Sequence, residues 1–190
     1  ATLDKAGPRG LELDHMVAKV GDDFNYLYSG SPFQFNVDET IISPVMRPEK
    51  KLFKIIQFIK KKNELDPLLY NSYLKGKYCS IFADIKGLKG LIINHRTSLD
   101  VMTNFFKADA ECFSERGIKR REKFYDCWDT IIEYWFLNPD NFFKGRFEKK
   151  LLSNIIIFED KYFAKSFYRE VDETLAVIPK RNIAPEFYHR

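Results

Sequence analysis

The sequence predicts one mixed domain of the α+β or α/β class, with a small sheet in the N-terminal half and a mostly helical C-terminal half. Short aromatic and β-branched runs, separated by glycine and proline, occur before about residue 95, as in strands and turns. Beyond Gly117 the apolar residues recur at helical spacing. The 190 residues, 45% of them hydrophobic, suffice for one core. We expect a loosely held arm at residues 1–22 and a single globular domain at 23–190.

The N-terminal half contains the expected strands. Residues 25–37 carry aromatic side chains on either side of a Ser-Gly-Ser-Pro turn, which is typical of a hairpin. A helix is expected at 48–63, because proline is tolerated in a first helical turn. Its apolar residues recur at helical spacing: Leu52, Ile55, Ile56 and Ile59. Two further strands are predicted at 78–85 and 90–94.

The C-terminal half is predicted to be helical. Thr97 is a plausible N-cap with Asp100 three residues later, so a helix is expected to begin there. A wide apolar stripe over 124–135 predicts a second helix, and residues 141–158 predict a third, whose isoleucine run leaves a strand open. Apolar residues four apart within 163–175 predict the last helix.

Positive charge is concentrated in one segment of a mildly basic chain. Lysine and arginine exceed aspartate and glutamate by 31 to 27, a net charge of +4, which permits a nucleic-acid partner without requiring one. Residues 47–62 carry most of this excess of positive over negative side chains. Two interpretations stay open: a solvated helix face, or contacts with phosphates. The lysines concerned are Lys50, Lys51, Lys54, Lys60, Lys61 and Lys62.

Cysteine usage favours an intracellular location, cytoplasmic or nuclear. The three cysteines are odd in number and widely spaced, unlike a disulfide framework. No apolar run approaches the ~20 residues that span a bilayer, and the N-terminus lacks the pattern of a signal peptide. The sequence does not indicate a protein partner.

Asp84-Ile85-Lys86 ends the strand predicted at 78–85 and is the best candidate for chemistry. Residues two apart on a strand point to the same side. A carboxylate there is suited to hold Mg²⁺, while the lysine orients a water or steadies charge on a phosphate. Asp66 offers a second carboxylate upstream, and Glu49 a third.

This order of residues resembles the PD-(D/E)XK nuclease superfamily over about residues 48–94. The resemblance implies that Asp66 and Asp84 bind Mg²⁺ or Mn²⁺ and that Lys86 assists the attacking water. Glu49 would be an accessory ligand or a structural acid. The basic segment would then hold the backbone of DNA or RNA.

A second candidate site combines His95 and Asp100. A histidine at a strand end and an aspartate in the next helix are suited to act as a base and its orienting group. The block is similar to the His-x4-Asp block of glycerolipid acyltransferases, where the histidine deprotonates a hydroxyl. The alternative without chemistry is that Thr97 and Asp100 cap a helix.

Two classes of function follow. The first is a metal-dependent endonuclease that hydrolyses phosphodiester bonds, with Asp66, Asp84 and Lys86 at its centre. The second is a non-enzymatic interaction or regulatory module with a basic surface helix. The acyltransferase-like site is a further alternative.

Overall fold

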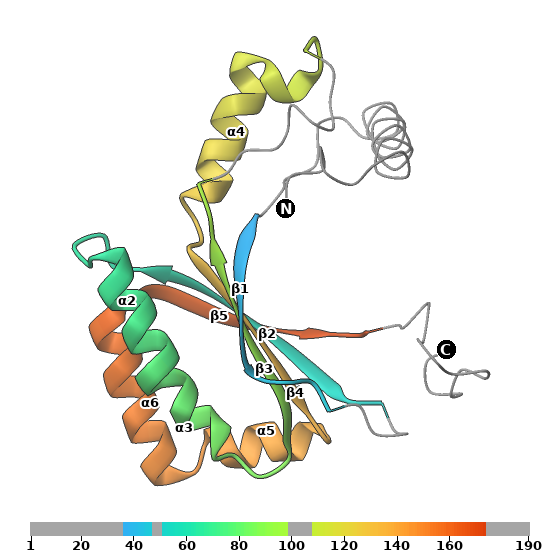
Figure 1. Ribbon diagram of the computed structural model, residues 1–190, viewed down its shortest axis with the longest axis vertical. Coiled ribbons are helices and arrows are strands. Elements are labelled where there is room, and N and C mark those ends of the chain that lie inside the picture. Colours follow the sequence, from blue (N-terminus) through green and yellow to red (C-terminus); the bar gives the residue numbers. More distant parts are fainter. Residues whose placement is uncertain (1–35, 47–50, 99–107, 174–190) are drawn as a thin grey trace, which may run out of the picture. The chain divides into compact units, whose positions relative to one another are not determined.

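The computed structural model describes residues 36–46, 51–98 and 108–173 (Figure 1). The chain forms two compact units, one of residues 37–96 and 128–190 and one of residues 1–36 and 97–127. The sequence does not signal this division. The arm expected at residues 1–22 lies outside the described residues.

The larger unit is built on a five-stranded antiparallel sheet. Its strands are β1 (Val37–Ser43), β2 (Phe53–Lys61), β3 (Leu88–Arg96), β4 (Thr130–Phe136) and β5 (Phe163–Val171), in the order β1-β3-β4-β2-β5. Every neighbouring pair is antiparallel. Since β2 and β3 both pair with β4, they run parallel and need a crossover connection.

Helices supply both crossovers and lie on the same side of the sheet (Figure 1). Between β2 and β3 run α2 (Pro67–Tyr73), a π-helical turn (Leu74–Tyr78) and α3 (Cys79–Ala83). Between β4 and β5 run α5 (Pro139–Arg146) and α6 (Lys149–Tyr162). The part from β2 to β5 therefore has the βαββαβ arrangement called ferredoxin-like, with β1 added beside β3.

The core lies between this sheet face and the helices. The strands contribute buried residues at alternate positions, and the helices contribute mainly aromatic rings. The fully buried large side chains are Tyr70, Tyr78, Tyr134, Phe82, Phe136, Ile59, Leu74, Leu91, Ile93, Ile132 and Ile155.

The predicted α+β class is confirmed, and so are the strand at 90–94 and the helical character of 141–158. The helix predicted at 48–63 is wrong, because residues 53–61 form β2. The apolar residues in this segment fit both the 3.6-residue repeat of a helix and the two-residue repeat of a strand, so a run this short does not distinguish the two. The many β-branched and aromatic side chains favour the strand.

The strand predicted at 78–85 is also wrong, because this segment completes the helical crossover. Tyr78 and Phe82 are four residues apart and both fully buried, which is helical periodicity. Asp66 and Pro67 begin this helix as its N-cap and first residue, a combination that favours helix initiation.

Two predicted C-terminal helices are strands in the structure. Residues 130–136 form β4 and residues 163–171 form β5. In β4 the residues Ile132, Tyr134 and Phe136 alternate into the core. The sheet thus draws strands from both halves of the chain, because non-local pairing places them between and beside N-terminal strands.

In the smaller unit the structure describes a 3₁₀ turn, Glu111–Phe113, and helix α4, Glu115–Tyr125. The Ser114 hydroxyl accepts a hydrogen bond from the backbone N–H of Gly117 at 3.1 Å and caps α4. The hairpin predicted at 25–37 and the helix predicted from Thr97 lie mostly outside the described residues. Among the described helices, none is long and apolar enough to cross a bilayer.

Candidate functional site: an aromatic pocket beside α5

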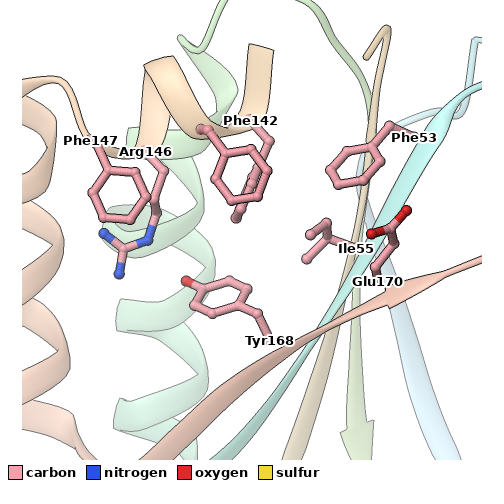
Figure 2. Close-up of a pocket in the computed structure, with 8 residues that line it drawn as sticks. Phe53, Ile55, Phe142, Arg146, Phe147, Tyr168 and Glu170 are labelled. Carbon is pink, nitrogen blue, oxygen red and sulfur yellow. The ribbon is translucent and has the colours of Figure 1, made fainter. Parts of the chain in front are cut away.

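A pocket of about 340 Å³ opens between α5 and the neighbouring ends of β2 and β5 (Figure 2). This volume lies in the range of small-molecule sites, which are mostly apolar with a few polar groups. The lining is five aromatic rings, one isoleucine and two charged side chains: Phe53, Ile55, Phe142, Phe143, Arg146, Phe147, Tyr168 and Glu170.

Strand register brings the floor of the pocket together. In the pairing of β2 with β5, Ile55 lies opposite Glu170 and Gln57 opposite Tyr168. Residues at alternate positions share one face, so Phe53 and Ile55 line the pocket with Tyr168 and Glu170. This is the sheet face that the helices cover.

Helix α5 forms the wall above this floor. The Asn138 side chain caps α5 by accepting from the backbone N–H of Asn141 at 3.0 Å, and Pro139 stands in its first turn. Residues three and four apart then project on the same side. Phe142 is buried, whereas Phe143 is 49% exposed and Phe147 is 62% exposed. These two exposed rings mark the mouth of the pocket.

The rings enclose the space without filling it. The ring centroids of Phe53 and Phe142 are 6.3 Å apart, and those of Phe142 and Tyr168 are 5.7 Å apart. Such separations are ordinary for packed aromatic pairs. The pocket is therefore a preformed apolar cavity with an aromatic rim.

A network of polar side chains lies behind the Tyr168 ring. Glu159 on α6 accepts hydrogen bonds from the Tyr78 hydroxyl at 2.6 Å and from Nη2 of Arg146 at 3.3 Å. The Tyr168 hydroxyl donates to the same carboxylate at 3.3 Å, and its oxygen is 3.2 Å from the Tyr78 oxygen. One carboxylate thus holds three donors from three elements.

Gln57 extends this network under the sheet face. Its side-chain N–H groups donate to the Tyr78 hydroxyl at 2.9 Å and to the Ser166 hydroxyl at 2.8 Å. Its carbonyl oxygen accepts from the Tyr134 hydroxyl at 2.6 Å. Gln57 is fully buried, so these bonds replace the water that it gives up on folding.

The tyrosines act as hydrogen-bond donors. Burial raises the pKa of the Tyr168 hydroxyl, and Glu159 adds to the rise; burial likewise raises the pKa of Tyr78 and Tyr134. The three hydroxyls therefore stay protonated at neutral pH. This favours a role in holding groups in place over a role as bases.

The residues of the nuclease resemblance do not come together. Asp66 is the N-cap of α2 and accepts from the backbone N–H of Leu69 at 2.8 Å. Asp84 is the C-cap of α3, so the helical residues 67–83, roughly 25 Å of helix, lie between the two aspartates. One Mg²⁺ would need both at about 2.0–2.1 Å.

The other members of that set are also placed apart. Asp84 and Lys86 flank a turn and both are exposed, so they do not share the face of a strand. Glu49 lies outside the described residues. Within the described parts of the chain, no group of three His, Cys, Asp or Glu side chains is placed to hold a metal ion.

The basic segment is a strand, so its lysines divide between two faces instead of forming one basic helix face. Lys50 lies outside the described residues. The other five are engaged in local contacts: Lys51 with Asp172, Lys54 with Glu133, Lys60 with Asp129, Lys61 with the Leu65 carbonyl and Lys62 with the Asp160 carbonyl. These contacts indicate a structural role.

His95 lies at the end of β3, with its Nδ1 3.1 Å from the Thr130 hydroxyl oxygen. Burial lowers the pKa of His95 below its ordinary value, although Asp38 opposes the shift. Asp100 lies outside the described residues, so its relation to His95 is not described.

None of the residues that line the pocket was predicted from the sequence to be a functional residue. The signal that was available is the spacing of Phe142, Phe143, Arg146 and Phe147, an arginine within an aromatic helix face. Tyr168 could not be found in the same way, because its place beside α5 depends on the pairing of β5 with β2.

The comparisons with known proteins do not assign the chain to a family. No protein-family model matches the sequence, and no curated protein matches it. A crystal structure of At3g17210 from Arabidopsis thaliana, after ensemble refinement, has 13% identity and a TM-score of 0.46, covering 66% of this chain and 99% of that chain. A solution structure of the same hypothetical protein has 14% identity and a TM-score of 0.42, covering 70% and 97%. Neither likeness bears on function.

Proposed function

We propose that the chain is a non-enzymatic binding module that takes up a small, largely apolar molecule in the pocket beside α5. The observation that carries this proposal is a preformed aromatic cavity whose rim includes two exposed phenylalanines, Phe143 and Phe147. Exposed aromatic rings are costly in water and gain most from covering by a ligand. A bound aromatic or branched aliphatic molecule would cover both.

The polar network supports binding over catalysis. Its hydroxyls have raised pKa values and donate hydrogen bonds, and its carboxylate already accepts from three donors. A general base needs a free acceptor near the operating pH. The network instead fixes Tyr168 and Arg146 rigidly at one side of the pocket, which lowers the entropy cost of binding.

The test is a screen of neutral aromatic molecules of one or two rings by saturation-transfer NMR, followed by calorimetry. We expect binding to the wild-type chain and a loss of at least about tenfold in the variant Phe143→Ala/Phe147→Ala. Ile157→Ala is the matched control, because Ile157 is 64% exposed on α6 and does not line the pocket. Absence of binding, or equal loss in the control, contradicts the proposal.

A second candidate is single-stranded nucleic acid on the sheet face opposite the helices. Phe58, Trp128 and Phe167 form a cluster there, with ring centroids 4.8–5.7 Å apart. The Lys165 ammonium is 4.5 Å from the centroid of the Trp128 ring, and the Arg169 guanidinium is 5.4 Å from that of Phe167. Aromatic rings beside cations on an open four-stranded sheet are how some modules stack bases.

Quenching of Trp128 fluorescence by an oligouridylate, measured at several salt concentrations, tests this second candidate. We expect Lys165→Glu to weaken binding and flatten the salt dependence. Lys149→Glu, at the start of α6, makes the same charge change elsewhere and serves as the control. Equal effects of the two variants would reject the candidate.

Two further hypotheses concern nuclease activity and the cellular location. The nuclease hypothesis requires a shared ion at Asp66 and Asp84, which the length of the helical crossover opposes. An intracellular location is supported by the free thiols of Cys79, Cys112 and Cys127.

A further inference from the structure

One donor of Arg146 points to the chemical class of the ligand. The Arg146 side chain is 11% exposed and lines the pocket. Its Nη2 bonds Glu159, whereas its Nη1 is buried and, within the described chain, has no hydrogen-bond partner. Buried side-chain donors nearly always have an acceptor, so an orphan at a pocket wall calls for an explanation.

The guanidinium is held in a fixed position. Its central carbon lies 5.6 Å from the centroid of the Tyr168 ring and 5.9 Å from that of Phe147. The ion pair with Glu159 fixes the opposite edge. Nη1 is covered while the neighbouring rings are in place, so a ligand reaches it only after the exposed Phe147 ring beside the guanidinium moves.

The hydrogen bonds between Glu159 and Arg146 go through Nη2 and not through Nη1. Oε1 of Glu159 already accepts from Tyr78, Tyr168 and Arg146, and its Oε2 also lies near Nη2. Glu170, the other acid of the lining, lies at the opposite side of the pocket in Figure 2 and is solvent-exposed. Glu159 offsets part of the positive charge of Arg146, and the edge of the guanidinium that carries Nη1 is turned away from that carboxylate.

We propose, on the premise of the proposed function, that the natural ligand is an apolar molecule carrying a carboxylate, which the Arg146 guanidinium binds through Nη1 once the Phe147 ring has moved aside. The apolar body lies against Phe142, Ile55 and Phe53. Guanidinium groups are suited to carboxylates, and a charge-assisted hydrogen bond in a dry site is stronger than one to a neutral group.

The experiment compares 2-naphthoate with 2-naphthamide by calorimetry at pH 7.5. The two compounds have the same shape and differ in charge. We expect the wild-type chain to bind the carboxylate about tenfold more tightly. In Arg146→Met the preference should disappear while binding of the amide persists. Lys149→Met, the matched control, removes a positive charge at the start of α6 outside the pocket lining and should keep the preference.

Arg146→Lys guards against a folding defect, because it keeps a charge for Glu159 while removing the planar fork. We expect it to fold and to lose most of the preference for the carboxylate. If Arg146→Met does not fold, the wild-type chain and Arg146→Lys decide the outcome.

The contrary outcomes separate this inference from its premise. If the wild-type chain binds the amide as tightly as the carboxylate, or binds only neutral aromatics, the carboxylate is refuted and the binding function stands. A preference that survives in both Arg146 variants assigns the anion to another cation and also refutes the inference. If no aromatic molecule binds, the proposed function fails and this inference fails with it.

Discussion

The two faces of the sheet are made by the same strands but differ in what covers them. On the face under the helices, Ile55, Ile59 and Ile132 are at most 4% exposed. On the opposite face, Ile56, Phe58 and Ile131 keep partial exposure and alternate with charged side chains. Alternation along each strand produces both environments from one sequence.

The difference between the two sheet faces shows on which of them side chains are held in fixed positions. The covered face holds a buried polar network around Gln57 and Glu159, and the pocket opens at its edge. Buried networks of this kind fix side chains more firmly than exposed ion pairs do. Four predictions test this contrast, from the largest expected effect to the smallest.

Removal of a ring from the covered face should cost the most stability. Phe82 is fully buried, with its ring 5.1 Å from that of Tyr78 and 4.8 Å from that of Tyr134. We expect Phe82→Ala to lower the free energy of unfolding by about 3–5 kcal/mol in urea denaturation. Phe58→Ala, on the opposite face, should cost about 1–2 kcal/mol. Equal costs would mean that the two faces are equally covered.

Breaking the polar network should cost somewhat less. Gln57→Leu removes the acceptor of the Tyr134 hydroxyl and leaves it buried, for an expected loss of about 1–3 kcal/mol. The double variant Gln57→Leu/Tyr134→Phe removes that hydroxyl as well and should be more stable than Gln57→Leu alone. A double variant that is less stable would show that the hydroxyl finds another partner.

Substitution of Asp66 tests how much a helix cap at the edge of the covering helices contributes to stability. Because its carboxylate caps α2, Asp66→Ala should cost about 1 kcal/mol of stability. Asp66→Asn, which retains a capping oxygen, should cost much less. Binding in the pocket should be unchanged in both variants by calorimetry. A large loss of stability in Asp66→Asn would indicate that the carboxylate charge has another role.

The smallest effect concerns the protonation of His95, which lies at the edge of the covered face. Burial lowers its folded-state pKa below the ordinary value of about 6.5, so the unfolded chain binds this proton more readily. Stability should therefore fall as the pH drops below about 6.5. His95→Gln should flatten the pH dependence of the urea midpoint between pH 7 and pH 5. An unchanged slope would mean that His95 titrates normally.

The sequence was informative where one property was strong and local. The strand at 90–94 and the helical segment at 141–158 were found from composition and spacing. The segments 53–61, 130–136 and 163–171 were assigned to helices, although all three are strands. Their apolar residues fit the repeat of a helix as well as that of a strand, and pairing with distant strands selected the strand.

The site shows the same limit more sharply. Asp84-x-Lys86 matched the motif of a metal-dependent site, but its proposed role required both residues to lie on one face of a strand, and the chain forms a helix and a turn there. Asp66 was interpreted as a metal ligand, whereas with Pro67 it begins α2 as the N-cap and first residue. Arg146 was visible only as one arginine among many, since its orphan donor and its ion pair with Glu159 arise from packing.

The sequence by itself determined the mixed class and the large aromatic supply for the core, because composition and local spacing are properties of the chain alone. Only the tertiary structure decided which apolar runs became strands, which sheet face was covered and where a pocket was left open. Contacts between residues far apart in the chain make those choices. Packing against β2 and β5 makes the aromatic face of α5 one wall of the pocket.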